Sequence, residues 1–457
     1  MKETKFKKIE TRPRQTTGGS VLRRKTAGGQ VREIPEGWKT YKLGDLAEIT
    51  SSKRIFLSEY VPNGIPFWRS KEVIEKFSKH DISTELFISK ERYCEIKSRF
   101  GVPQKNDILL TSVGTLGIPY IVADSDNEFY FKDGNLTWFK DFKCEHILPQ
   151  YLYFWTRSKQ GKRQLLDSSI GSTQQAFTIA GLKQVYIELP PLAEQKAIAK
   201  ILGDLDEKIA INNRMNKTLE AMGQALFKRW FIDFEFPNGK GKPYKSSGGK
   251  MMDSELGEIP SSWGICHVPD MFDFLEGPGI RNWQYVESGM PFINIRLIQG
   301  GDINTQGANA VSLDEGNGKY AHFQLQERDM VVSTSGTLGR TAIVRKEHLP
   351  LLLNTSVIRF RPKDGDSYSY MYGFLKSIYF LTELESSASG SVQANFGPMH
   401  LENMKIIKAI PEVLAKFETI QRPFYKKIAK VLSENTNLAT IRDSFLPKLM
   451  SGKIRVG

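Results

Sequence analysis

The strongest feature of the sequence is an internal repeat, in which segments of the first half return in the same order in the second half. The offset between matched segments stays within 219 to 225 residues over five ordered matches. Solenoid repeats have periods of roughly 20 to 50 residues, so each copy here is a whole domain followed by a helix. The matched pairs are IPEGW (34–38) with IPSSW (259–263), GIPFWR (64–69) with GMPFIN (289–294), NDILLTSVGTLGIPYIV (106–122) with RDMVVSTSGTLGRTAIV (328–344), SIGSTQQAF (169–177) with SASGSVQANF (387–396), and the long helical patterns that follow Pro191 and Pro411.

Each copy begins with a region of mixed strand and helix pattern, at residues 33–187 and 255–409. Short apolar runs such as 107–111 and 329–333 are bounded by Gly, Asn and Asp, which predicts strands joined by turns. Residues 89–100 predict a short helix. The pattern indicates a compact α+β domain but does not give its strand order.

Each copy ends in a long helical pattern, within residues 188–236 and 410–457. Apolar residues recur at steps of three and four over about 40 residues, which would form a rod of roughly 60 Å. This length and spacing favour a coiled-coil seam over a surface helix. The predicted seam residues are Ile198, Leu202, Leu205, Ile209, Asn216 and Leu219 in the first helix and Phe417, Phe424, Ile428, Asn435 and Leu438 in the second.

Two polar or helix-breaking features interrupt this apolar seam. Asn216 and Asn435 occupy equivalent positions, where an Asn either fixes the register of the seam or marks a locally exposed turn. Pro423 predicts either a kink in the second helix or the residue at which that helix begins. If the two helices pack antiparallel, pseudo-twofold symmetry would place the two domains at opposite ends of the rod.

The formal net charge of +13 is concentrated in two segments. Residues 1–32 carry ten basic and two acidic residues, and residues 237–250 carry four lysines and no acidic residue, so these segments account for +8 and +4 and leave +1 for the rest. We expect residues 1–32 to be a flexible basic extension and residues 237–254 a flexible Gly/Lys-rich linker. The body of the protein is close to neutral, so its charge does not by itself predict a nucleic-acid partner.

The composition indicates a cytoplasmic protein. Three widely spaced cysteines (Cys94, Cys144 and Cys266) exclude a disulfide framework and a CxxC metal site. There is no run of about 18 apolar residues, and the basic N-terminus lacks the apolar stretch of a secretory signal. We therefore expect no membrane span.

A search for catalytic motifs gives no candidate. SGGKM (247–251) lacks the spacing and the hydroxyl residue of a phosphate-binding loop. The HxE match at 400–402 is not followed by the PCxxC of zinc deaminases. The six histidines have no spacing typical of a metal site, so we expect no catalytic residue, metal or cofactor on this chain.

Glycine- and hydroxyl-rich loops occur at matching positions in the two copies and are candidates for DNA contact. In TSVGTLG (111–117) and STSGTLGR (333–340), glycine allows the backbone to approach a phosphate, and hydroxyls can donate to it. Gln and Asn in 171–177 and 390–396 have the donor and acceptor pair that reads adenine. A structural β-turn explains the glycines equally well, and surface position explains each residue singly, but the correspondence between copies favours contact. The candidates are Arg69, Lys71, Ser112, Thr115, Ser172, Thr173, Gln174 and Gln175 in the first copy and Asn294, Arg296, Ser335, Thr337, Arg340, Ser391, Gln393 and Asn395 in the second.

Taken together, these motifs resemble the specificity subunits of type I restriction-modification systems. The resemblance covers roughly residues 33–457 and is carried by IPEGW/IPSSW, the GTLG turns, GSTQQAF, LKQVYIELPPLAEQKAIAKIL (182–202) and DSFLPKLMSGKIRV (443–456). The second copy departs from it at IPEVLAKFETIQ (410–421), which lacks the Pro-Pro and Glu-Gln pairs.

This resemblance implies a tandem pair of α/β-mixed target recognition domains separated by two long antiparallel helices. Each domain would read one half of a split, asymmetric site in double-stranded DNA, and the helices would set the spacing. Two modification subunits would bring S-adenosylmethionine for adenine methylation. Restriction subunits would add translocation and cleavage driven by ATP with Mg²⁺.

Two other classes of protein stay open on the sequence alone. One is a stand-alone DNA-modifying or DNA-cleaving enzyme with an unrecognised site, and the other is a coiled-coil scaffold that binds only protein. Activity of the purified chain on DNA would favour the enzyme. A reconstituted complex that shows no sequence preference would favour the scaffold.

Overall fold

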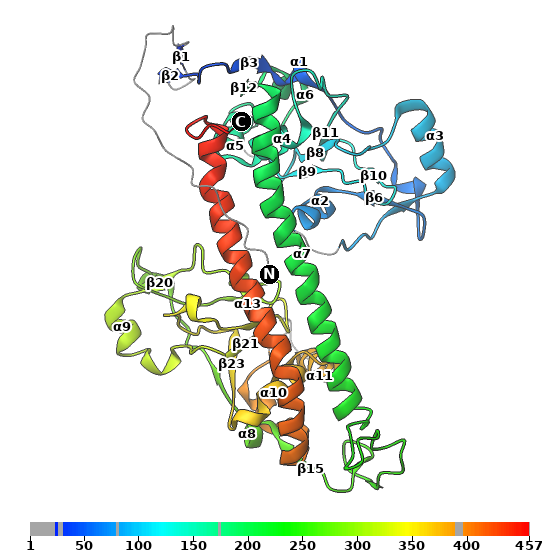
Figure 1. The fold of residues 1–457 in the computed structure, drawn as a ribbon, viewed down its shortest axis with the longest axis vertical. Coiled ribbons are helices and arrows are strands. Elements are labelled where there is room, and N and C mark those ends of the chain that lie inside the picture. The colour runs from blue at the N-terminus through cyan, green and yellow to red at the C-terminus, as the bar shows by residue number, and fades with distance from the viewer. Residues whose placement is uncertain (1–22, 26–30, 79–81, 172–174, 389–395, 457) are drawn as a thin grey trace, which may run out of the picture. The chain divides into compact units, whose positions relative to one another are not determined.

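The computed structural model describes residues 23–25, 31–78, 82–171, 175–388 and 396–456 (Figure 1). The chain forms two compact units. The first takes in the chain up to Leu205 and again from Ile441 onward, and the second is Asp206–Thr440. The boundaries therefore fall inside both long helices. Each repeat contributes its helix to both units, unlike the separate helical segments expected from the sequence.

A four-stranded antiparallel sheet with the same strand order lies in each unit. In the first unit the order is β4 (Glu48–Thr50), β11 (Leu136–Lys140), β8 (Ile108–Thr111), β9 (Pro119–Ile121). In the second it is β16 (Phe272–Glu276), β23 (Val357–Pro362), β21 (Met330–Ser333), β22 (Thr341–Ile343). The registers also correspond, since Leu110 pairs with Pro119 and Val332 with Thr341. The sequence repeat is thus a repeat of sheet topology.

A short antiparallel pair accompanies each sheet, namely β3 (Lys39–Lys42) with β12 (Tyr186–Leu189) and β15 (Gly264–His267) with β24 (Lys405–Lys408). Short helices complete the repeated part. They are α1 (Leu43–Leu46), α4 (Pro149–Arg157), α5 (Lys159–Leu166) and α6 (Ile179–Gln184) in the first unit, and α8 (Val268–Met271), α10 (Tyr368–Leu375), α11 (Ile378–Ala388) and α12 (Pro398–Asn403) in the second.

The two units differ mainly in the segments between β4 and β8 and between β16 and β21, and the first unit adds one strand from the segment after β9. The first unit has a sheet ordered β10 (Tyr130–Phe131), β6 (Ile65–Trp68), β7 (Phe87–Ile88), β5 (Tyr60–Val61), with helices α2 (Ser70–Phe77) and α3 (Lys90–Phe100). Helix α3 is the helix predicted at 89–100, and the Ser89 hydroxyl caps it by accepting the Arg92 N–H. The second unit has two strand pairs, β17 (Met290–Pro291) with β20 (Ala310–Val311) and β18 (Ile298–Gln299) with β19 (Asp302–Ile303), and helix α9 (Leu313–Asn317).

Short 3-10 turns and two further strand pairs complete the described elements. The 3-10 turns are η1 (Leu57–Glu59), η2 (Asn282–Gln284), η3 (Ile295–Leu297), η4 (Ala321–Phe323), η5 (Lys346–His348) and η6 (Gly365–Ser367). The strand pairs are β1 (Arg23–Lys25) with β2 (Val31–Glu33) and β13 (Met251–Met252) with β14 (Ile259–Pro260). Strand β1 and the start of β2 fall within the N-terminal extension predicted at residues 1–32.

The two long helices, α7 (Leu192–Phe231) and α13 (Pro411–Met450), pack together as an antiparallel pair (Figure 1). Pro411 begins α13, and the helix continues through Pro423. The expectation that the helix begins at Pro423 is therefore wrong. Proline is tolerated at the first turn of a helix because the N–H there has no intrahelical acceptor. At Pro423 the helix lacks one hydrogen bond but is not interrupted.

Most of the predicted seam side chains are buried, within one unit or the other. In the first unit, Ile198 and Leu202 share a core cluster with Leu446 and Leu449 of α13. Among the other seam positions, Ile209, Asn216, Phe417 and Ile428 are buried, and Leu205, Leu219, Phe424, Asn435 and Leu438 are partly buried.

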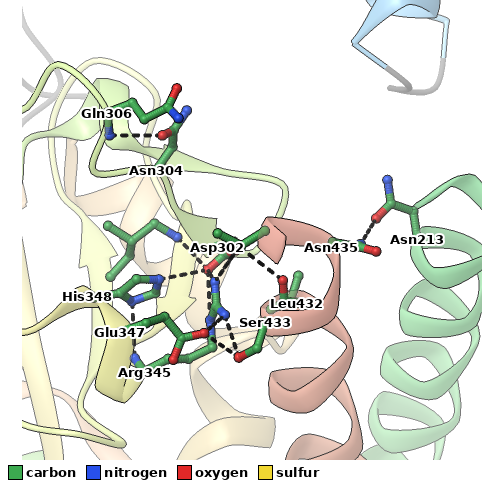
Figure 2. Close-up of polar contacts among 12 residues, drawn as sticks. Asn213, Asp302, Asn304, Gln306, Arg345, Glu347, His348, Leu432, Ser433 and Asn435 are labelled. Carbon is green, nitrogen blue, oxygen red and sulfur yellow. Dashed lines mark hydrogen bonds and ion pairs between the residues drawn. The ribbon is translucent and has the colours of Figure 1, made fainter. Parts of the chain in front are cut away.

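Asn435 forms a polar contact between the helices within the second unit. Its amide oxygen accepts from Asn212 at 2.9 Å, and its amide nitrogen donates to Asn213 at 2.7 Å, the contact drawn in Figure 2. The partners of Asn435 are thus residues just before Asn216, its equivalent in the repeat. Polar contacts inside an apolar seam favour a single register, because every slipped register leaves them unpaired.

The Leu-Pro-Pro-Leu-x-Glu-Gln motif (189–195) leads into α7, and its last residue stabilises the fold there. The buried Gln195 side chain accepts the Leu148 N–H at 2.9 Å and donates to the carbonyls of His146 and Pro190. It thereby caps the start of α4. In the second unit Glu418 of α13 accepts the Ser369 N–H at 2.8 Å, at the start of the equivalent helix α10. The second copy has lost the motif but keeps a side chain of the long helix on this N-terminus.

The tryptophan of each IPxxW segment packs on the C-terminal end of a long helix. Trp263 stacks on Phe236 at 4.8 Å between ring centroids and lies 5.7 Å from Phe231 at the end of α7. Trp38 lies against the Gly452 backbone, just after α13. Trp38 and Trp263 are both buried, so they belong to the core.

The segment 237–254 is more ordered than the expected flexible linker. The Tyr244 ring stacks on Phe236 at 4.6 Å, the Asn238 N–H donates to the Lys242 carbonyl at 2.8 Å, and Lys245 pairs with Glu258. The high Gly and Lys content suggested a flexible tether. The aromatic residues on either side supply the contacts that hold its turns in place.

In the second unit, a buried ionic cluster fastens the segment around β19 to α13 (Figure 2). The Arg345 guanidinium donates to Asp302 at 2.6 and 2.7 Å and to the Ser433 hydroxyl of α13 at 2.7 Å. It also contacts Glu347, and the Nε2 atom of His348 lies 3.4 Å from Asp302. Burial alone would raise the pKa of Asp302, but the hydrogen bonds from His348 and Arg345 outweigh burial and hold that pKa below its ordinary value.

Arg345→Met should destabilise the second unit by about 3 kcal/mol at pH 7, because it leaves a largely buried carboxylate without its cation. A carboxyl group whose pKa is lowered by folding adds stability above its unfolded pKa, and this stability is lost as the pH falls through the folded value. The difference between variant and wild type should therefore shrink below about pH 4. Thermal unfolding of the full chain at several pH values tests this.

Ser433→Ala is the matched control, because it removes the hydrogen bonds of this hydroxyl with Arg345 and Glu347 and leaves the Arg345–Asp302 pair intact. We expect a smaller loss from it at pH 7, of about 1 kcal/mol. An Arg345→Met variant with a wild-type midpoint at pH 7 would contradict the assignment.

Candidate nucleic-acid interface

The GTLG turns lie at one end of the four-stranded sheet in each unit. In the first unit the turn joins the end of β8 to the start of β9, and the end of β4 and the start of β11 lie at the same edge because the strands are antiparallel. In the second unit β21, β22, β16 and β23 repeat this arrangement. We call these two edges the loop edges.

Both GTLG turns are held by the same hydrogen bonds. The Thr111 hydroxyl accepts the Ile118 N–H at 2.9 Å, and the Ser333 hydroxyl accepts the Arg340 N–H at 2.9 Å. In both turns, the N–H of the second glycine also donates to the carbonyl of that Thr or Ser at 2.9 Å. Thr111 and Ser333 shape the turns, a role that the sequence analysis missed although the hydroxyl is shared by both copies.

The turn glycines have the backbone conformation that only glycine adopts freely. Gly114 and Gly117 have φ values of 76° and 76°, and Gly336 and Gly339 have φ values of 64° and 74°. Turn geometry thus accounts for these glycines without a ligand. The same geometry leaves Thr115 and Thr337 exposed at the tips, where their hydroxyls are available to a partner.

Backbone hydrogen bonds join each turn to two neighbouring loops. In the first unit the Ser112 N–H donates to the Asn135 carbonyl at 2.8 Å, and its carbonyl accepts from Phe177 at 3.0 Å. In the second unit Thr334 makes the same pair of bonds, to Ser356 at 2.9 Å and from Phe396 at 3.0 Å. Phe177 and Phe396, which follow the Gln and Asn candidates in the sequence, are therefore held beside the turn.

The prediction that Ser112 contacts DNA is wrong. The Ser112 side chain is buried, and its hydroxyl bonds Thr137 at 2.6 Å and the Leu110 carbonyl at 3.1 Å, so a phosphate cannot reach it. Thr115 and Gln175 are exposed on the loop edge. Ser172, Thr173 and Gln174 lie outside the described residues.

Arg69 and Lys71 lie near the same edge but are engaged in ion pairs. The Ser70 hydroxyl between them donates to the Asn135 carbonyl at 3.4 Å. Arg69 pairs with the buried Glu72 at 3.0 Å and with Glu85, and Lys71 pairs with Glu85 at 2.7 Å. The hydrogen bond to Glu72 is the main reason that the pKa of Arg69 is raised. Arg69 therefore has a structural partner in the absence of DNA.

In the second unit the candidates gather around the turn from two directions. Arg340 leaves the turn exposed and donates to the Ile298 carbonyl at 3.4 Å, and the exposed Arg296 donates to the Gly307 carbonyl at 2.7 Å. Ser335 and Asn294 are partly buried. Ser391, Gln393 and Asn395 lie outside the described residues. No group of three or more His, Cys, Asp or Glu side chains suited to a metal ion occurs among the described residues.

Equivalent aspartates anchor the strands that carry the turns, with different partners. Asp107 accepts from the indole N–H of Trp138 at 2.8 Å and from the Gln104 N–H at 2.8 Å, and burial raises the pKa of Asp107 to about 6. Asp329 accepts the equivalent Gln326 N–H at 2.7 Å and is paired with the Arg361 guanidinium. Both copies therefore have the anchoring carboxylate, but its side-chain donor is the neutral indole of Trp138 in the first unit and the charged guanidinium of Arg361 in the second.

Comparison with known proteins identifies the family to which this chain belongs. The family described as type I restriction modification DNA specificity domain matches the chain twice, at residues 35–221 and 260–441. The chain belongs to this family. It is the DNA specificity subunit of a type I restriction-modification system, and thus a non-catalytic part of a multi-subunit enzyme.

Related specificity subunits align over nearly the whole chain. The chain is 26% identical over 441 residues to the type I restriction enzyme MjaIX specificity subunit of Methanocaldococcus jannaschii, covering 93% of this chain and 95% of that one. It is 23% identical over 471 residues to the HindI specificity subunit of Haemophilus influenzae, covering 91% and 99%. The solved type I S subunit from M. genitalium shares the fold, with a TM-score of 0.53 at 16% identity, covering 91% of this chain and 96% of that one.

The specificity subunit acts with modification and restriction subunits and DNA. Among its described residues no helix is long and apolar enough to cross a membrane.

The two anchoring aspartates should respond to the same substitution with opposite signs. A native carboxyl with a raised pKa binds its proton more tightly than the unfolded chain does, so Asp107 makes stability fall as the pH rises from about 4 to about 6. Asp107→Asn should therefore raise the unfolding midpoint at pH 7 and match wild type near pH 4. Asp329→Asn should lower it at pH 7, because Arg361 loses its partner. Midpoints that shift in the same direction would contradict this account.

Loss of the turn hydroxyl should loosen one turn at a time. Ser333→Ala should speed amide hydrogen exchange at Arg340 about fivefold, as expected for one hydrogen bond of about 1 kcal/mol, and should leave Ile118 unchanged. Thr111→Val should do the reverse. Thr337→Ala alters an exposed hydroxyl of the same turn and serves as the control. Equal exchange at Arg340 in Ser333→Ala and in Thr337→Ala would show that the hydroxyl does not hold the turn.

Proposed function

We propose that each unit of this specificity subunit reads one half of a bipartite, asymmetric DNA site through its loop edge. The observation that carries the proposal is that one hydrogen-bonded loop framework is built twice while the side chains that it presents differ. Ile118 in the first turn corresponds to Arg340 in the second. Two identical readers would read a symmetric site, and two divergent readers on one chain read an asymmetric one.

The exposed side chains of the loop edges supply the proposed contacts. Thr115 and Thr337 are placed to donate to phosphates, and Arg340 and Arg296 to bind phosphate or guanine. Gln175 and the neighbouring Ser172, Thr173 and Gln174, with Ser391, Gln393 and Asn395 in the second copy, are proposed for base readout. Arg69 and Lys71 would have to exchange Glu85 for a phosphate. Ser112 is withdrawn because it is buried.

The proposal for partner subunits rests on the surfaces of α7 and α13. We propose that two modification subunits dock on these helices and bring S-adenosylmethionine for adenine methylation, and that restriction subunits add ATP-driven, Mg²⁺-dependent cleavage. In support, both helices expose large apolar side chains that a protein partner would cover. They are Ile201, Ile211 and Met222 on α7 and Ile420, Ile441 and Phe445 on α13.

Genome-wide mapping of methylated adenine, with and without the gene, tests the proposal directly. A split motif that disappears on deletion supports it. Methylation or cleavage by the purified chain alone would favour a stand-alone enzyme. A reconstituted complex that binds DNA without sequence preference would favour a protein scaffold.

A matched deletion in the helices should change the spacing between half-sites. Removing seven residues, nearly two turns, from each helix at the boundary between the units (203–209 and 438–444) shortens the pair by about 10 Å, or up to three base-pair steps. We expect a shorter spacer in the methylation map and unchanged half-sequences. Seven-residue insertions at the same places should lengthen the spacer. An unchanged spacer in both variants would refute the role of the helices as a ruler.

A further inference from the structure

Each unit exposes large apolar side chains on a short 3-10 turn that the proposed readout does not use. In the first unit η1 follows β4 and presents Phe56 and Leu57, which are 60% and 83% exposed. In the second unit η2 follows β16 and presents Trp283, which is 80% exposed. A Trp is rarely left this exposed on a surface that has no partner, because burial of an aromatic side chain is strongly favourable.

The two 3-10 turns are equivalent parts of the repeat. Each is closed by a polar side chain at its third position that accepts a backbone N–H. Glu59 accepts from Phe56 at 2.7 Å, and Gln284 accepts from Arg281 at 3.0 Å. Tyr60 and Tyr285 follow the turns at the same offset as the IPxxW segments. The exposed apolar side chains occupy different positions of the two turns, because at this offset Trp283 corresponds to Ser58, and Phe56 and Leu57 correspond to Arg281 and Asn282. Each turn nevertheless presents at least one large exposed apolar side chain.

Side-chain contacts with neighbouring segments hold both turns. In the first unit Glu59 also pairs with Arg92 of α3 at 2.8 Å. In the second unit the buried Gln284 donates to Glu315 at 2.9 Å and to the Tyr320 hydroxyl at 2.8 Å. These contacts hold the backbone of both turns, from which the side chains of Phe56, Leu57 and Trp283 extend into solvent.

Polar contacts connect the segment just before each 3-10 turn to the loop edge. In the second unit the Thr355 N–H donates to the Pro278 carbonyl at 3.1 Å, and Ser356 accepts from Thr334 of the GTLG turn. In the first unit Arg54 pairs with Asp133 at 3.1 Å, and the nearby Asn135 accepts from Ser112. The apolar side chains thus belong to the same edge as the proposed DNA contacts, and each has an exposed arginine within two or three residues, Arg281 or Arg54.

We propose that Trp283, and Phe56 with Leu57, are apolar wedges that insert at a base step of the half-site read by their own unit. This inference rests on the proposed function of the loop edges. Apolar side chains that enter between base pairs unstack them, and a rigid base with a flanking arginine on the phosphate is suited to hold the kinked step. Trp283 would act in the second half-site only, and Phe56 with Leu57 in the first only.

The test uses the reconstituted complex of full-length chain and modification subunits, with a duplex that carries the split site found by methylation mapping. 2-Aminopurine is placed at successive positions of each half-site, because its fluorescence rises when the base unstacks. Wild-type complex should raise fluorescence at one step in each half other than the adenine that the modification subunits flip out for methylation. Trp283→Ala should abolish the rise in the second half only and weaken binding about tenfold, the scale of losing one aromatic stacking contact. The double variant Phe56→Ala with Leu57→Ala should abolish the rise in the first half only.

Two control variants separate insertion from a loss of fold or of assembly. Trp283→Phe keeps an aromatic wedge and should restore most of the signal. Met252→Ala removes a 44% exposed apolar side chain from strand β13 of the same unit and should have no effect.

Three outcomes would overturn the inference. First, retention of both affinity and fluorescence by Trp283→Ala would show that no wedge is present. Second, failure of this variant to assemble with the modification subunits on size exclusion would show that the side chain meets protein. Third, a wild-type complex that reads the split site with no 2-aminopurine response except at the flipped adenine would exclude insertion while leaving the proposed function intact. A wild-type complex with no split site would count against both.

Discussion

The packing of the C-terminal end of α13 into the first unit is the interaction on which the remaining structure depends. Leu446, Leu449 and Met450 complete a core whose other members come from the first repeat, and Arg455 forms an ion pair with Glu194 at 2.7 Å. The second unit depends in the same way on the end of α7, where Phe227 and Phe231 lie in the core with Trp263. Neither repeat contains all the residues of a core, so the folding of each unit depends on residues from both repeats.

The two units share this framework, and their function depends on the loop side chains that differ between them. The bonds that shape the GTLG turn and tie it to its neighbours are the same in both units, whereas the side chains at its end differ, as Ile118 and Arg340 show. The greatest divergence lies between β4 and β8 and between β16 and β21, where one unit builds three strands of a four-stranded sheet and the other builds two short strand pairs. A specificity subunit needs this combination, since the framework positions the loops and the loops determine the sequence that is read.

The sequence alone predicted the duplication, the mixed α/β units and the two long helices, because these leave signals in repeat offset and apolar periodicity. It did not predict the boundary of the units inside the helices, because periodicity does not say which core a helix joins. Ser112 was wrongly assigned because the sequence does not show that its side chain, like that of the adjacent Thr111, is buried and that its hydroxyl bonds Thr137. The linker was expected to be flexible because Gly and Lys dominate its composition, whereas a few aromatic contacts around Tyr244 fix its turns.

The guanidinium of Arg455 also donates to the Glu36 carbonyl at 3.0 Å, which brings residues 36 and 455 together. Through this contact the folded part of the chain is a ring closed by noncovalent bonds. The packing of the elements therefore does not depend on which of them comes first in the sequence. A circularly permuted chain, joined covalently between these residues and opened in the turns around Gly239, would lose the β1–β2 pair but keep the contacts of α7, α13 and the two four-stranded sheets, and would exchange which unit is synthesised first.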